Sequence, residues 1–164
     1  MNYSGLDLFQ NKDNLVEFVG DVSEGIPKPD KYFDYVVALD LVEHVDDFHG
    51  CLNELLRVSN KTLIIMLPNM GHIFFRVKFL FFAQFSGKYN MIYGAGVDRH
   101  RWITTQAQCD LYIAKFAEEN YLKMHTIWFC DSRKKVLFSR LCRFFGISPN
   151  LWAWATYYVL DREN

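Results

Sequence analysis

The sequence predicts an α/β fold, a three-layer sandwich in which helices cover both faces of a mostly parallel sheet. Tyr35–Leu39 is apolar at every position, as is typical of a strand buried on both faces of a parallel sheet. Thr62–Leu67 is a second run of β-branched and apolar residues, and the segment between the two runs has apolar residues at helical spacing. This alternation of buried strands and amphipathic helices predicts the α/β class.

Two shorter strands are predicted before these two apolar runs. A helix is predicted between the two runs. Tyr3–Leu8 and Leu15–Val19 are the candidate strands, and a polar connection joins them. The helix is predicted to begin after a cap, Asp46 or Asp47, and to end at about Val58.

The second half of the chain is predicted to contain two more helices and two more strands. In chain order they are a helix over Thr104–Tyr121, a strand over Leu122–Cys130, a helix over Val136–Phe145 and a strand over Ala155–Asp161. The length suits one domain with a single core, so we expect one domain over residues 1–164.

An aromatic-rich segment, residues 71–93, changes the pattern. Its phenylalanines are interleaved with Arg76, Lys78 and Lys88, and it is too short and too charged to span a bilayer. Three interpretations fit: a helix that packs on the core, which is the favoured one, an insertion that covers a site and lines a ligand pocket, or an amphipathic helix that lies in a membrane surface.

The composition limits the expected partners. The net charge is −1 and no run of Lys or Arg is long, so no nucleic-acid partner is expected. The four cysteines lack the CxxC and histidine spacing of a metal site, so we expect no metal and interpret them as buried thiols of a cytoplasmic protein. The N-terminus lacks the basic and apolar pattern of a signal peptide.

Polar side chains follow the apolar run that ends at Leu39. Asp40, Glu43 and His44 come directly after it. Ligands bind beyond the carboxyl ends of the strands in parallel sheets, so these residues are candidates for a site. An equally weighted alternative is a helix start whose acidic residues complement the helix dipole.

Several motifs together resemble one known family. The run FDYVVALDLVEHVDD, the helix LNELLRVS and the strand TLIIMLPN are similar to the second half of a class I S-adenosylmethionine-dependent methyltransferase, most closely the type 11 group. Asp7 and Asp21 stand where the family's second and third strands end, and the DRHRW segment that ends at Trp102 resembles some members of the group. The resemblance covers most of the chain and implies a Rossmann-like methyltransferase fold.

The resemblance also implies a missing part. The family begins with a strand, a GxGxG loop and a helix, and none of these precedes Asp7 in this sequence. Gly94–Ala95–Gly96 is the only GxG, and we interpret it as a turn. The sequence is therefore expected to be truncated at its N-terminus, with a wrong start or a cut from a longer protein as the favoured explanation. The alternative is an inactive methyltransferase-like domain that serves as a binding or scaffold module.

For the sheet, the resemblance implies an order. The strands at residues 15–19, 3–8, 35–39 and 62–67 are expected in one parallel sheet, with a gap between the second and third where the family's first strand belongs. The last two strands are expected as an antiparallel edge, and residues 71–98 as an aromatic-rich insertion.

The resemblance implies S-adenosylmethionine as the cofactor. The matching positions are Asp7, Leu8, Asp21, Val22, Leu39 and Asp40. Asp7 would accept hydrogen bonds from both ribose hydroxyls, and Asp21 from the adenine amine. Val22 would pack on the adenine ring, and the backbone of the last two positions would face the methionine amino group.

Candidates for the methyl acceptor come from two segments. His44 is the candidate general base because imidazole titrates near neutral pH, although a role in orienting a loop by hydrogen bonding is favoured. The other candidates are Asn69, His72, Arg99, His100, Arg101 and Trp102. The two arginines would hold a carboxylate or phosphate, and an equally weighted alternative is a salt-bridge cluster with Asp46, Asp47 or Asp98.

The expected function is methyl transfer from S-adenosylmethionine to a small or lipid-linked acceptor. The cofactor carries its own activation, so the protein chiefly holds the methyl carbon against the acceptor atom. Peripheral membrane contact is one expectation, since the phenylalanines of residues 74–85 and 138–145 lie among basic residues. The competing expectation is that these phenylalanines pack on the sheet and on each other.

Overall fold

The computed structural model describes residues 3–13, 16–85, 87–89, 93, 99–130 and 133–163. Three sequence expectations concern residues outside these ranges: the strand position Leu15, the turn at Gly94–Ala95–Gly96 and the ion pair of Asp98.

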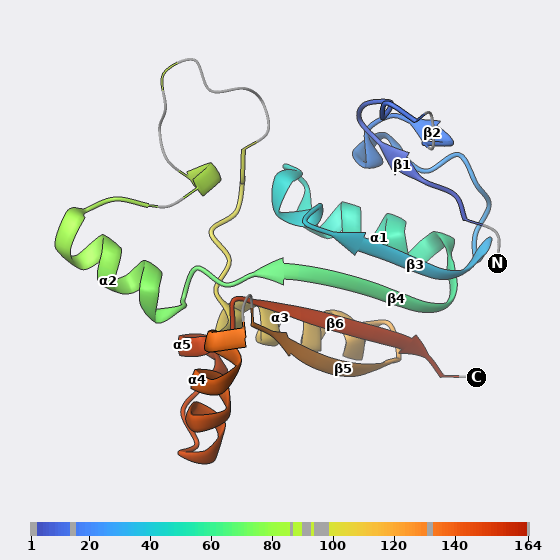
Figure 1. The fold of residues 1–164 in the computed structure, drawn as a ribbon. Helices are drawn as coiled ribbons and strands as arrows, with labels where there is room; N and C mark the ends of the chain where they lie inside the picture. The colour runs from blue at the N-terminus through green and yellow to red at the C-terminus, as the bar shows by residue number, and fades with distance from the viewer. Residues whose placement is uncertain are drawn as a thin grey trace.

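A four-stranded sheet forms the centre of the fold (Figure 1). Its strands are, in spatial order, β3 (Phe33–Leu39), β4 (Ser59–Pro68), β6 (Ala155–Arg162) and β5 (Leu122–Phe129). β3 and β4 are parallel, whereas β6 is antiparallel to both of its neighbours. The predicted strands of this part are present, and the last two pair as the expected antiparallel edge.

The two N-terminal strands form a sheet of their own. β1 (Leu6–Asp7) and β2 (Phe18–Val19) are parallel to each other, and each is only two residues long. The expectation of one sheet is therefore wrong. The reason is that no described strand lies between β1 and β3 to carry the hydrogen-bond ladder across, and the break falls where the gap was expected.

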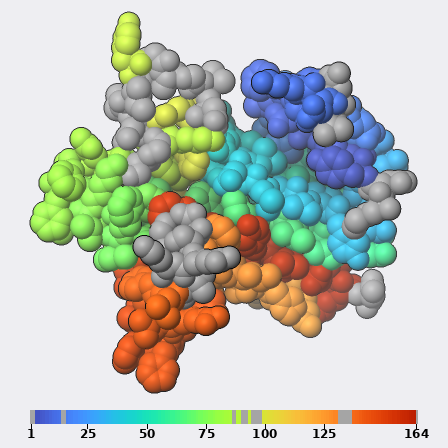
Figure 2. All heavy atoms as spheres, viewed as in Figure 1, coloured from blue at the N-terminus to red at the C-terminus, as the bar shows by residue number. Residues whose placement is uncertain are grey.

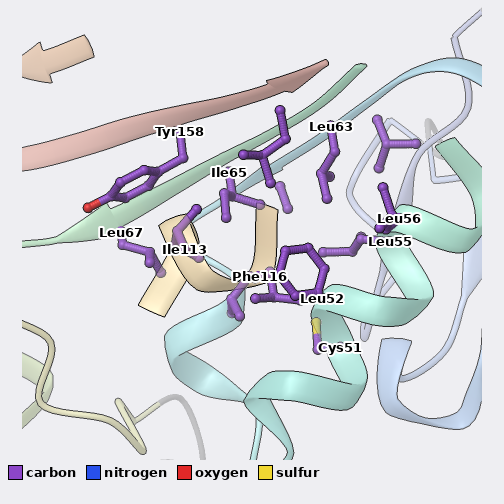
Figure 3. Close-up of a cluster of buried hydrophobic side chains, with 14 of the residues drawn as sticks. Cys51, Leu52, Leu55, Leu56, Leu63, Ile65, Leu67, Ile113, Phe116 and Tyr158 are labelled. Atoms are coloured by element: carbon purple, nitrogen blue, oxygen red, sulfur yellow. The ribbon is translucent and has the colours of Figure 1, made fainter. Parts of the chain in front are cut away.

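Two helices pack on one face of the larger sheet. α1 (Phe48–Val58) begins after Asp47, whose carboxylate accepts a hydrogen bond from Gly50 N at 2.8 Å. α3 (Gln106–Glu119) begins after Thr105. Figure 3 shows the side chains that meet between these helices and the strands, among them Leu52, Leu55, Leu63, Ile65, Ile113, Phe116 and Tyr158. Each such buried side chain contributes about 1.5–3 kcal/mol.

The opposite face of the sheet is open over the described residues. Tyr35 and Val37 point to this face and are each 56% exposed, whereas Val36 and Ala38 face the core at 9% and 3%. Ile127 of β5 is 58% exposed on the same open side. The expectation that the strand is buried on both faces is therefore wrong. The α/β class is present, and the described residues supply two of the three expected layers.

The helices α2 (Ile73–Phe82) and α4 (Arg133–Phe144) project from the body, as Figures 1 and 2 show. No residue of α2 is buried, so the favoured interpretation of a helix packed on the core is wrong for this segment. Apolar residues occupy all sides of α2, so the sequence pattern does not define a single face that packs on the core. α4 contacts α5 (Pro149–Trp152) through Cys142. Over the part of the chain described, no helix combines the length and apolar character needed to cross a membrane.

Candidate functional site

The carboxyl end of β3 is held against the segment that leads into α3 (Figure 1). At Asp40 the backbone takes the left-handed conformation (φ 50°), and the short 3-10 helix η2 (Val42–His44) follows. The backbone N–H groups of Arg101 and Trp102 donate to the carbonyl of Glu43 at 2.8 and 3.4 Å. The indole of Trp102 also donates to the carbonyl of Val45 at 2.8 Å. These bonds fix residues 99–102 beside the strand end.

Glu43 is fully buried at this junction, with 0% exposure. Neither oxygen of its carboxylate has a hydrogen-bond partner of good geometry among the described residues, although its own backbone N–H and the side chain of Asp40 lie nearby. The pKa of Glu43 is raised to about 7, chiefly by burial and also by the nearby carboxylate of Asp40, whereas a hydrogen bond from its own backbone N–H and the charge of Lys88 lower it. An ionised carboxylate is costly to bury unless a positive charge or a hydrogen-bond donor lies next to it.

Two histidines lie next to Glu43. Nδ1 of His44 lies 3.2 Å from the carbonyl oxygen of Arg99, and since a carbonyl only accepts, Nδ1 carries the hydrogen. A contact of this kind is what a loop-orienting His44 would make, and the role itself stays a prediction. The rings of His44 and His100 meet edge to face with centroids 4.5 Å apart, and the ring centroid of Tyr89, in η3 (Gly87–Tyr89), lies 4.6 Å from that of His100.

The two acids expected at the nucleoside lie at one end of the small sheet. The N–H of Gly20 donates to the carbonyl of Asp7 at 2.9 Å, so the ends of β1 and β2 meet. The exposed carboxylate of Asp7 accepts from Phe9 N at 3.1 Å, and that of Asp21 accepts from Ser23 N at 2.8 Å at the start of η1 (Val22–Glu24). The expectation that Asp7, Asp21 and Asp40 surround one cleft stays a prediction, since Asp40 belongs to the other sheet.

The remaining expected cofactor positions differ in exposure. Leu8 and Leu39 are 54% and 49% exposed, and Asp40 is also exposed. Val22 is 3% exposed and belongs to the main core, but it also lines a hollow of ≈ 250 Å³ between η1 and α1 together with Gly25, Gly50 and Glu54. Asp21 is not among the residues that line this hollow.

Asn69 has a structural role, which corrects the expectation that it faces the acceptor. Its side chain is 1% exposed. The amide nitrogen donates to the carbonyls of Asn150 and Ala153 at 3.1 and 2.7 Å, and the amide oxygen accepts from Gly71 N and Gln106 N at 2.9 and 3.0 Å. All four hydrogen-bonding positions of the amide are therefore occupied by backbone groups.

The other acceptor candidates also make contacts within the protein. His72 is 7% exposed and caps α2, its Nδ1 accepting from Phe74 N at 3.1 Å. The guanidinium of Arg101 lies 3.4 Å from the carboxylate of Asp46, which is the salt bridge of the alternative interpretation. Trp102 is 44% exposed and remains accessible.

A cavity of ≈ 450 Å³ lies between the beginnings of α1 and α3. Its lining includes Phe48, His49, Leu67, Trp102, Cys109 and Tyr112. The cavity opens at the same end of the sheet as Glu43, because Leu67 lies near the carboxyl end of β4 and Trp102 is bonded to the segment after η2. Of the residues predicted for the acceptor, only Trp102 is among those that line it. No pattern in the sequence predicts that the other lining residues surround a cavity.

The comparisons with known proteins agree with the fold. The model of the methyltransferase domain family matches residues 4–65, and no curated protein matches the chain. A methyltransferase dependent on S-adenosylmethionine from Archaeoglobus fulgidus is similar in structure, with a TM-score of 0.56 at 14% identity over 97% of this chain and 75% of that one. A possible histamine N-methyltransferase from Thermotoga maritima gives a TM-score of 0.53 at 14% identity, over 93% of this chain and 67% of that one.

A small RNA methyltransferase, HEN1, is also similar, with a TM-score of 0.52 at 14% identity. The match covers 79% of this chain but only 14% of that one. Identities this low show a shared fold, and the cofactor expected from the family is S-adenosylmethionine. The resemblance to class I S-adenosylmethionine-dependent methyltransferases is therefore confirmed, in sequence over residues 4–65 and in fold over nearly the whole chain.

Proposed function

We propose that this chain serves the transfer of the methyl group of S-adenosylmethionine to a small or lipid-linked acceptor. The observation that carries the proposal is the family match over residues 4–65, which contains two acids at the ends of adjacent parallel strands, Asp7 and Asp21. Ligands of such sheets bind at the carboxyl ends of the strands.

The chemistry of these residues fits the nucleoside half of the cofactor. The exposed carboxylate of Asp7 accepts one described hydrogen bond, from Phe9, so it has lone pairs left for two ribose hydroxyls. Asp21 would accept from the adenine amine, with Val22 against the ring. The backbone at Leu39 and Asp40 would face the methionine part. The cofactor supplies the activated methyl group, and these side chains bind and orient it.

Asp7→Ala tests the cofactor assignment. Loss of hydrogen bonds to a charged group costs about 1.5–3 kcal/mol, so we expect S-adenosylmethionine to bind the full-length protein roughly tenfold to a hundredfold more weakly. Isothermal titration calorimetry measures this, with the exposed loop residue Asp13 changed to alanine as the control. If Asp7→Ala binds S-adenosylmethionine as tightly as the unsubstituted protein, Asp7 does not bind the cofactor. If the unsubstituted protein binds no S-adenosylmethionine, the alternative of an inactive binding or scaffold module is favoured.

The exposed helices support a lipid-linked acceptor. Leu80, Phe81 and Phe82 of α2 are 76%, 71% and 68% exposed, and Phe144 of α4 is 82% exposed. Both helices contain basic residues and no acidic ones. Apolar side chains among positive charges suit the surface of an anionic membrane, where a lipid-linked substrate would be found. The competing account, in which these side chains pack away from solvent, disagrees with these exposures.

Flotation with anionic liposomes tests the membrane contact. We expect the full-length protein to float with the vesicles, more strongly at low salt because surface attraction is screened by salt. Leu80→Asp should abolish flotation, whereas Leu111→Asp on α3 should not, although both leucines are 76% exposed. Protein that stays in the soluble fraction at both salt concentrations would point to a soluble small-molecule acceptor.

A further inference from the structure

We propose that the cavity of ≈ 450 Å³ between the beginnings of α1 and α3 binds a free organic ammonium ion with an apolar body. Aromatic rings, two carboxylates and an apolar floor line this cavity. Its volume lies within the range of about 300–1,000 Å³ that is typical of small-molecule sites. Binding there is independent of methyl transfer and does not rest on the proposed function.

Three aromatic side chains form the walls of the cavity. The ring centroid of Trp102 lies 6.2 Å from that of Phe48, with an angle of 73° between the ring planes. The centroid of Tyr112 lies 5.2 Å from that of Phe48, with an angle of 89°. Rings at such steep angles to one another can surround a cation on more than one side, and a cation over an aromatic face within about 6 Å is attracted by the ring.

Two of these rings are held in place by the protein. The indole N–H of Trp102 donates to the carbonyl of Val45 at 2.8 Å. The hydroxyl of Tyr112 lies 2.9 Å from Nδ1 of His49. The polar atom of each ring therefore has a partner in the protein, and walls that are fixed before the ligand arrives lower the cost of binding.

The charged side chains of the cavity favour a cation. Asp46 and Asp47 line it, and neither Lys nor Arg is among the described lining residues. The carboxylate of Asp46 lies 3.4 Å from the guanidinium of Arg101, which balances part of its charge, whereas Asp47 accepts from a neutral backbone N–H. The pKa of Tyr112 is raised, chiefly by burial and also by the charges of Asp47 and Glu119, so the Asp47 charge reaches the aromatic wall.

The helix beginnings beside the cavity do not make it an anion site. Free N–H groups at the start of a helix attract anions. The first three N–H groups of α3 each donate to a side-chain oxygen, on Asn69, Asn150 and Thr105 in turn, at 3.0, 3.3 and 3.4 Å. At α1 the carboxylate of Asp47 already caps the helix. An anionic ligand would therefore meet carboxylates in place of free donors.

The floor of the cavity favours an organic cation over an inorganic one. Leu67, Cys109 and Ile113 form this floor and are 1%, 6% and 0% exposed, and the first and last are labelled in Figure 3. A small hydrated ion would lose water there without gaining ligands. An ammonium group with an apolar body instead buries that body against the floor.

Benzyltrimethylammonium is the probe, because it joins an aromatic ring to a permanent positive charge. We expect it to bind the full-length protein and to shift the indole N–H signal of Trp102 in nuclear magnetic resonance spectra. Benzyl alcohol and benzoate have a similar body without the positive charge, so both should bind at least about tenfold more weakly. Choline and phosphocholine separate a free ligand from a lipid headgroup, and choline should bind more tightly because the phosphate is repelled by the two carboxylates.

Two variants test the two parts of the site. Asp47→Asn removes the charge and keeps the helix cap, since asparagine caps helices as well as aspartate does. We expect it to bind the probe roughly twofold to fivefold more weakly, as for a partly exposed charge pair. Phe48→Leu removes a ring but keeps an apolar side chain, and should bind roughly 2- to 30-fold more weakly. Asp13→Asn makes the same change of charge on an exposed loop residue outside the cavity and is the matched control.

Circular dichroism checks that each variant is folded. The proposal is overturned if the unsubstituted protein does not bind the probe, or if benzyl alcohol binds as tightly as the probe. Equal affinities of Asp47→Asn and Asp13→Asn would also overturn it, as would tighter binding of phosphocholine than of choline. Shifts that leave the signals of Trp102 and Tyr112 unchanged would place the ligand elsewhere. None of these measurements depends on methyl transfer, so the ammonium site and the proposed function are tested separately.

Discussion

At the scale of single residues, the amide of Asn69 joins three separate parts of the chain. It connects the end of β4 to the start of α3 and to α5 through four hydrogen bonds with backbone groups. Because the side chain is buried, water cannot replace these partners.

Replacing Asn69 by leucine should strongly destabilise the fold. The leucine has a similar volume but leaves two N–H groups and two carbonyls without partners, and each buried unpaired group costs about 1–3 kcal/mol. We expect the free energy of unfolding to fall by at least ~2 kcal/mol. Urea unfolding followed by circular dichroism measures it, with the exposed Asn53→Leu on α1 as the control. Equal midpoints for the two variants would contradict the structural role of Asn69.

The positions of the site residues could be predicted from the sequence, but the directions of their side chains could not. Asp7 is the last residue of β1 and Asp40 follows β3, as expected. Asn69 also follows a strand, yet its side chain turns toward residues 71, 106, 150 and 153. Motif spacing could not predict that Glu43, His44 and His100 lie together, because His100 comes from a distant segment of the sequence.

At the scale of elements, Arg57 ties the loop before β3 to α1. Its Nε and Nη2 donate to the two carboxylate oxygens of Glu54, both at 2.7 Å. Its Nη1 donates to the carbonyl of Lys28 and to Asp30, both at 2.9 Å, and Nη2 also donates to the carbonyl of Ile26 at 3.0 Å. The planar guanidinium thus holds three loop residues on the helix.

Glu54→Gln should weaken this connection in a pH-dependent way. The hydrogen bond from Arg57 lowers the pKa of Glu54 below its usual 4.5. The stabilising contribution is therefore fully present above pH 4.5 and is lost as the pH falls through the folded-state pKa. We expect the variant to be less stable than the parent by roughly 1–2 kcal/mol at neutral pH.

This difference should shrink on acidification, as measured by urea unfolding between neutral and acidic pH. Glu118→Gln on α3 replaces an exposed glutamate and serves as the control. A constant difference between Glu54→Gln and the parent over the whole pH range would contradict the charge-assisted contact.

Elements with strong periodicity could be predicted closely, and their packing partners less so. The helix expected to end at about Val58 does end there, because its cap and apolar spacing are local signals. For α2 the sequence indicates a helix but not its surroundings, since apolar residues on every side suit a buried and a projecting helix alike. β1 and β2 are shorter than expected because strand length depends on partner strands as well as on propensity.

At the scale of the whole molecule, the two sheets differ in how strongly they are held. The four-stranded sheet has the core of α1 and α3 against it, with Leu63 and Ile65 of β4 both at 0% exposure. The small sheet consists of two two-residue strands, and its main link to the core is Val22 with the half-buried Leu6. A local sequence pattern does not show this division into two sheets, because the division depends on whether another strand lies between β1 and β3.

Amide hydrogen exchange should therefore divide the chain into two regions. Regions with few buried contacts open at lower free energy than the core, so we expect the amides of β1 and β2 to exchange faster than those of β4.

Because Asp7 and Asp21 lie at the ends of the small sheet, cofactor bound there should stabilise that region above all. Exchange measured by mass spectrometry with and without S-adenosylmethionine should show slower exchange around residues 6–7 and 18–19 and little change in β4. Protection that rises only in β4 would place the bound cofactor away from these two acids, and equal exchange in both sheets without ligand would mean that the molecule opens as one unit.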